Sequence, residues 1–108
     1  MALLLAMGLL VGCGSDPEPD EVWTVRGVFE APMLEGDAAM IRHEEVPGLM
    51  DAMRMDFLVA DPREIEGLAP ETPIEFEIAW TDGRTVARRF LVLPDTVSLN
   101  VPPPPHRF

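Results

Sequence analysis

One histidine and three methionines lie within residues 43–55, and their side chains could bind a soft metal ion. Met53 and Met55 are separated by a single residue, and His43 precedes them at the end of an apolar run. In an extended strand this spacing places both sulfurs on the same face. Met50 supplies a third sulfur from the intervening segment. Neutral imidazole with thioether sulfur favours Cu(I) or a similar soft ion over Mg²⁺ or Ca²⁺.

The same methionines have a second interpretation as core residues, because methionine commonly fills gaps in small cores. His43 is the only histidine in the body of the chain, since His106 lies in a Pro-rich tail. Met40 has the opposite strand parity to His43, so we expect its side chain to face away from any such site. Spacing alone therefore leaves both a metal site and a methionine-containing core open.

The segment resembles the periplasmic copper- and silver-binding chaperones of the CusF-like family. The matching residues are His43, the turn 46–50 (Val-Pro-Gly-Leu-Met), the run 53–57 (Met-Arg-Met-Asp-Phe), and the segments 59–62 (Val-Ala-Asp-Pro) and 68–70 (Leu-Ala-Pro). The resemblance covers the chain from Val25 to Leu93. It implies a small OB-like β-barrel that binds Cu(I) or Ag(I).

Residue by residue, the resemblance assigns His43, Met53 and Met55 as the metal ligands. The best-known members have a tryptophan just before the methionine pair, where it caps the metal through a cation–π contact. This chain has Met50 near that position. Three roles therefore stay open for Met50: a fourth ligand, a hydrophobic cap, or neither.

The implied function is a metallochaperone that passes Cu(I) to or from another protein of the bacterial cell envelope. The partner would be a copper-efflux component or an oxidase-assembly factor. The alternative is a metal-free OB-like module whose surface binds a peptide or a glycan. No nucleophile–base pair is recognisable in the sequence, so we do not expect an enzyme.

Charge and cysteine content exclude several further classes. The formal net charge is −11, and all eight basic residues are arginines, which argues against nucleic-acid binding even for an OB-like fold. The single cysteine excludes an intramolecular disulfide and a Cys-rich zinc site. We expect a monomer.

The N-terminal region has the organisation of an exported, membrane-anchored protein. Residues 1–12 are apolar and have the length of a signal-peptide core. They end in Leu-Val-Gly before Cys13, which resembles a bacterial lipoprotein signal with lipidation at the cysteine; an ordinary secretory signal is the alternative. Residues 13–21 form an acidic, flexible tether. We therefore expect a lipid-anchored protein on the periplasmic side of a bacterial membrane.

The remaining chain is expected to form one all-β domain, 22–94, followed by the Pro-rich tail 95–108. Five strands are predicted, at 22–31, 38–43, 53–59, 73–81 and 84–93. Asp82-Gly83 predicts a hairpin, a bulge is expected near Arg88-Arg89, and Asp61 can cap a helical turn. The pattern indicates a β-barrel or a sandwich, and the family resemblance favours a small five-stranded OB-like barrel. The predicted core is Val25, Val28, Ile41, Phe57, Val59, Leu68, Ile74, Phe76, Ile78, Val86 and Phe90.

Overall fold

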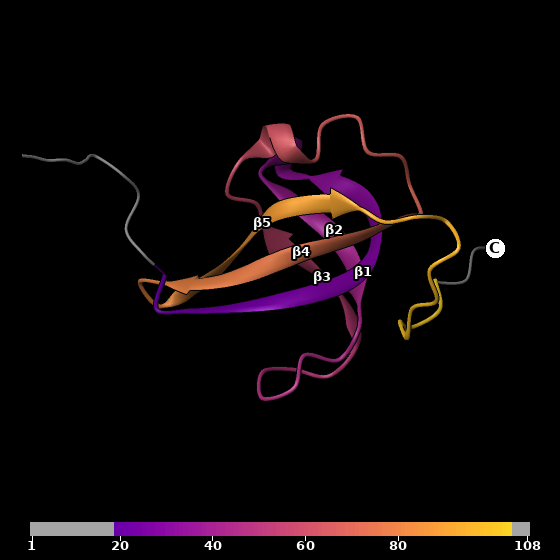
Figure 1. Ribbon diagram of the computed structural model, residues 1–108. Coiled ribbons are helices and arrows are strands. Elements are labelled where there is room, and N and C mark those ends of the chain that lie inside the picture. Colours follow the sequence, from indigo (N-terminus) through magenta and orange to yellow (C-terminus); the bar gives the residue numbers. More distant parts are fainter. Residues whose placement is uncertain (1–18, 105–108) are drawn as a thin grey trace, which may run out of the picture.

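The alternation of apolar and polar residues along the chain produces one curled antiparallel sheet (Figure 1). The computed structural model describes residues 19–104. Its strands are β1 (Glu21–Met33), β2 (Ala38–His43), β3 (Met53–Leu58), β4 (Thr72–Thr81) and β5 (Arg84–Val92). Two short 3-10 helices complete it, η1 (Leu34–Gly36) and η2 (Pro62–Glu64).

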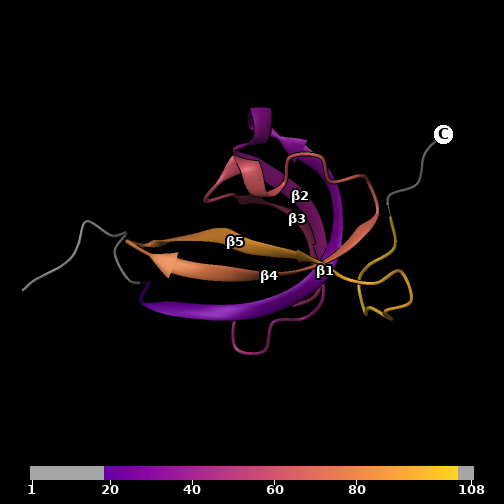
Figure 2. The same ribbon diagram turned by 45° about the horizontal axis from the view of Figure 1, so that its top comes forward.

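The strand order is β3-β2-β1-β4-β5, and every neighbouring pair is antiparallel. The sheet curls so that its two edge strands approach each other (Figure 2). A parallel bridge joins Val59, just after β3, to Ala87 of β5, and the Ala60 N–H donates to the Ala87 carbonyl at 2.9 Å. The predicted all-β, five-stranded OB-like fold is confirmed, although the sheet is not strictly closed, because its edges meet through this short contact and not through a full ladder.

Several local predictions are also confirmed. Asp82 and Gly83 both have positive φ between β4 and β5, as a tight hairpin turn requires. The β4–β5 register shifts opposite Arg89, whose φ is 57°, so the expected bulge is present. The Asp61 side chain accepts the Arg63 N–H at the start of η2. β1 is longer than predicted and continues through Pro32, which was expected to lie in the turn.

The core prediction was wrong at two positions, and strand parity explains both. Val28 lies on the same face of β1 as its partner Arg42 and is only half-buried, whereas Phe29 is fully buried. On β5 the small Ala87 is buried opposite Ile78, while Val86 is half-buried. Leu68 and Phe90 are partly buried against the core. The buried core consists of Val25, Phe29, Ala39, Ile41, Val46, Phe57, Val59, Ile65, Ile74, Phe76, Ile78 and Ala87.

The predictions for the signal segment 1–12, for Cys13 and for His106 lie outside the described residues. Within residues 19–104 there is no helix long and apolar enough to cross a membrane.

Candidate metal centre

The pairing of β2 with β3 brings together the three residues that spacing singled out. His43 is directly opposite Met53, and Ile41 is directly opposite Met55. Directly opposite residues have Cβ atoms about 5 Å apart, and diagonal neighbours are about 7–8 Å apart. His43 and the sulfur-bearing side chains of Met53 and Met55 therefore share one face, within reach of one another.

The His43 ring is buried and fixed from two sides. Its Nδ1 lies 2.6 Å from the Glu44 carbonyl oxygen, which can only accept a hydrogen bond, so Nδ1 carries the proton. The Phe57 ring packs against the imidazole edge-on, with centroids 5.5 Å apart. These two contacts define both the tautomer and the orientation of the ring.

The other ring nitrogen, Nε2, is buried and has no hydrogen-bond partner among the described residues. Glu30 Oε2 and Arg42 Nε also lack an aligned hydrogen bond, but these two atoms form an ion pair with each other at 3.0 Å. A buried polar atom without a partner is costly in a folded protein. The lone pair of Nε2 is therefore available for a ligand.

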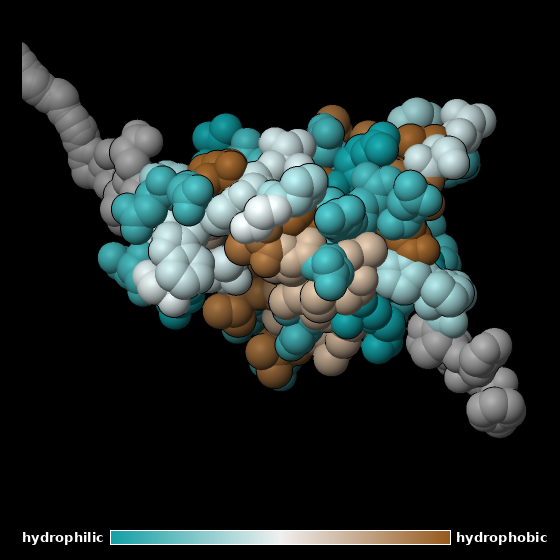
Figure 3. Space-filling model, turned by 90° about the horizontal axis from the view of Figure 1, so that it is seen from below, coloured by the Kyte–Doolittle hydropathy of each residue, from teal (hydrophilic) through white to brown (hydrophobic). Residues whose placement is uncertain are grey.

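Exposure of the site rises from His43 outward. His43 is 0% exposed, Met55 is half-buried, and Met53 is 36% exposed. Met50 pairs with Val46 across the tight loop after β2 and packs, partly buried, against the core. Figure 3 views the molecule from the side on which this loop projects and shows apolar residues that run from the middle of the face to its lower edge. The sulfurs thus lie between a buried imidazole and solvent.

Met40 faces away from this site, as its parity predicts. It lies with Met33 in a separate cavity on the other face of β1 and β2. No group of three or more His, Cys, Asp or Glu side chains within residues 19–104 is arranged to hold a metal ion. The described part of the chain therefore offers soft donors at His43, and no cluster of hard oxygen donors elsewhere.

Two residues that support the site were missed from the sequence. Glu44 supplies the carbonyl that orients His43. Gly27 pairs with His43 across β1 and β2, and a Cβ at Gly27 would lie 2.9 Å from the His43 Cα. A glycine inside a predicted strand indicates a close backbone approach, so that signal was present in the sequence.

Comparison with known proteins gives both a family and a fold. The family model described as copper binding periplasmic protein CusF matches residues 22–90. The structure is similar to apo-CusF from Escherichia coli, with a TM-score of 0.60 and 16% identity over 78% of this chain and 100% of that one. A tryptophan-to-alanine variant of the same protein with Cu(II) matches with a TM-score of 0.52 and 15% identity, over 76% of this chain and 100% of that one. No curated protein sequence matches the chain.

Proposed function

This chain belongs to the CusF family of copper-binding periplasmic proteins, and we propose that it binds one Cu(I) or Ag(I) ion through His43, Met53 and Met55. The observation that carries the proposal is the unpartnered, buried Nε2 of His43 directly opposite Met53. Histidines that bind metals almost always donate their other ring N–H to an oxygen acceptor. His43 has that arrangement through the Glu44 carbonyl.

The donor set suits a monovalent soft cation. One imidazole nitrogen and two thioether sulfurs are neutral ligands, and soft sulfur ligands select Cu(I) over hard cations. Methionine sulfur needs no deprotonation, so binding at this site displaces at most the proton that competes for Nε2.

Met50 adds either a further sulfur ligand or a hydrophobic shield over the ion. Its position three residues before Met53, and its partial burial against the core, support a place at the rim of the site. A Met50→Leu variant separates the two roles, because leucine keeps a hydrophobic cover and removes the sulfur.

We further propose that the protein is a metallochaperone on the periplasmic side of a bacterial membrane, anchored through a lipid on Cys13. The exposed Met53 side chain gives an incoming ligand from a partner protein access to the ion, while His43 stays buried. Thioethers hold Cu(I) less tightly than thiolates do, which favours transfer. The partner would be an envelope protein that donates or accepts copper, such as an efflux component or an oxidase-assembly factor.

A competition titration against a colorimetric Cu(I) chelator under reducing conditions tests the site. The wild type should bind one ion per chain. Met53→Leu and Met55→Leu should bind far more weakly, and the matched control Met40→Leu should bind like the wild type. Leucine roughly conserves volume, so circular dichroism should show intact folding in all three variants. Equal affinities in the three variants would leave the methionines as core residues and favour a metal-free binding module.

A further inference from the structure

The described residues that follow β5, 93–104, fold back onto the sheet. The family match ends at residue 90 and β5 ends at Val92, so this segment lies beyond both. A turn closes where the Val97 N–H donates to the Pro94 carbonyl at 3.1 Å. The segment then runs on the side of the molecule where β1 bends (yellow in Figure 1). We call residues 93–104 the C-terminal strap.

The strap begins with the Leu93 N–H, which donates to the Pro73 carbonyl of β4 at 2.9 Å, and two further hydrogen bonds tie it to the barrel. The backbone N–H of Asn100 donates to Glu44 Oε2 at 2.8 Å. Arg42 Nη1 donates to the Pro102 carbonyl at 3.2 Å. Because prolines have no N–H, the run 102–104 offers only backbone carbonyls for hydrogen bonding, and an arginine is a matching donor.

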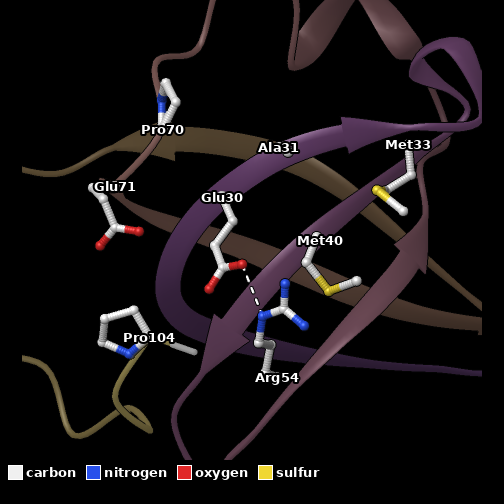
Figure 4. A pocket seen from close by; sticks show the side chains of 8 residues that line it. All are labelled: Glu30, Ala31, Met33, Met40, Arg54, Pro70, Glu71 and Pro104. Atoms are coloured by element: carbon white, nitrogen blue, oxygen red, sulfur yellow. Dashed lines mark hydrogen bonds and ion pairs between the residues drawn. The ribbon is translucent and has the colours of Figure 1, made fainter. Parts of the chain in front are cut away.

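The arginine in this contact is buried, and each of its three nitrogens has a partner in a hydrogen bond or an ion pair. Arg42 is 4% exposed, pairs with Glu30 through Nε at 3.0 Å, and hydrogen-bonds to Glu71 through Nη2. Figure 4 shows the Glu30 and Glu71 carboxylates and Pro104 around the same cavity, with Glu30 also bonded to Arg54. The strap is therefore held by a charge network on the outer face of β1 and β2.

The two residues that hold the strap are the immediate neighbours of His43. Successive side chains of an extended chain point to opposite faces, so Arg42 and Glu44 point outward where His43 points inward. Glu44 has two roles at once: its carboxylate accepts from Asn100 and Arg26, and its carbonyl accepts from His43 Nδ1. Fixing the Glu44 side chain from outside thus fixes the acceptor that orients the imidazole.

We propose that the C-terminal strap is a positioning element for the metal site, acting through Glu44 on the His43 ring. The inference rests on the proposed function of His43 as a ligand. The contact comes from Asn100, which lies outside residues 22–90, the part of the chain that the family model matches. None of the strap's hydrogen bonds to the barrel goes to a proposed ligand, so its effect is on the geometry of the ring and not on the donor set.

Asn100→Pro tests the strap, because it removes the N–H that Glu44 accepts while keeping an extended backbone. Asn100→Ala keeps that N–H and is the matched control, and Ser98→Pro controls for adding a proline to the strap. Loss of a direct outer-shell partner costs about 10–100-fold in metal affinity; for this more remote contact we expect a Cu(I) affinity about 3–10-fold weaker in Asn100→Pro. Both controls should match the wild type.

A second readout reports on the ring itself. Imidazole ¹⁵N resonances of the metal-free protein at fixed pH distinguish the Nδ1–H from the Nε2–H tautomer. The wild type should show the Nδ1–H form, and Asn100→Pro a mixture. If the strap only stabilised the fold, Asn100→Pro would lower the melting temperature and leave these resonances unchanged.

The outcomes separate the strap from the copper site. If the wild type binds Cu(I), equal Cu(I) affinities of Asn100→Pro and Asn100→Ala overturn the proposed role of the strap. If the wild type does not bind Cu(I), the proposed function fails. In that case unchanged imidazole resonances in Asn100→Pro are enough to overturn the proposal that the strap positions the His43 ring. If Asn100→Pro does not fold, amide exchange in the wild type decides: coupling is reciprocal, so Cu(I) should slow exchange at Asn100, and no change overturns the proposal.

Discussion

Replacing Gly27 with alanine should destabilise the barrel and weaken metal binding together. A Cβ at this position would lie 2.4 Å from the Arg42 carbonyl oxygen and 2.9 Å from the His43 Cα, both backbone atoms that cannot rotate away. Ordinary contact begins near 3.4 Å, so β1 and β2 must separate locally by about 1 Å. That movement occurs beside the hydrogen bond from the Glu44 N–H to the Arg26 carbonyl.

The expected loss of stability follows from these distances. Overpacking a well-packed position costs about 1–3 kcal/mol, and a weakened backbone hydrogen bond adds about 1 kcal/mol. Alanine recovers about 0.4–1 kcal/mol by restricting the unfolded chain. The free energy of unfolding should fall by about 1–3.5 kcal/mol, which urea titration measures, with about 4–8 °C in Tm per kcal/mol.

Gly67→Ala is the control for this variant. Gly67 has a φ of +83°, and a Cβ added there would have no neighbour within 4 Å, so alanine at this position is strained without crowding the site. Such strain costs about 1–2 kcal/mol. Both variants should lose stability, and only Gly27→Ala should also lose Cu(I) affinity. Wild-type stability and affinity in Gly27→Ala would refute the close approach of β1 to His43.

Three further predictions concern protons and the membrane. Cu(I) affinity should fall as the pH is lowered, because protons compete for His43 Nε2. Cu(I) titrations at several pH values should show that each ion displaces at most one proton. An affinity that does not depend on pH would show that His43 is not a ligand. A hydrogen bond from the Arg63 side chain, and a second one from the Arg63 backbone N–H, lower the pKa of Asp61. The stability that this cap contributes is therefore present above the pKa of the unfolded state. It is lost as the pH falls through the lower pKa of the folded state. The Tm difference between wild type and Asp61→Ala should therefore shrink in acid, and a constant difference would show that the charge of Asp61 has no part in it. Cys13→Ser should release the protein from membranes or leave an uncleaved precursor, and wild-type fractionation would contradict lipidation.

Local chemistry made much of the fold predictable. The Asp61 cap, the Asp82-Gly83 hairpin and the bulge at Arg89 all follow from residue types within a few positions of each other. The choice of the inward face was less certain where a strand offers apolar residues of both parities. On β1 we predicted Val28 as a core residue, but alternation from the buried Val25 places Phe29 on the inward face and leaves Val28 half-buried.

In the candidate site, too, some features follow from local sequence and others only from the pairing of distant segments. Spacing along β3 placed Met53 and Met55 on one face, but the register that sets Met53 opposite His43 depends on how the whole loop between β2 and β3 closes. The contacts from Asn100 to Glu44 and from Pro102 to Arg42 join residues more than fifty positions apart. No local pattern encodes such a contact, so the docking of the tail is visible only in the folded chain.

X-ray absorption spectroscopy of the Cu(I)-loaded protein tests the proposed site most directly, because it counts the atoms around the ion. We expect one imidazole nitrogen and two sulfurs around the ion, with a third sulfur if Met50 binds, and the loss of one sulfur in Met53→Leu. A spectrum with nitrogen and oxygen neighbours only, or one unchanged in Met53→Leu, would contradict it.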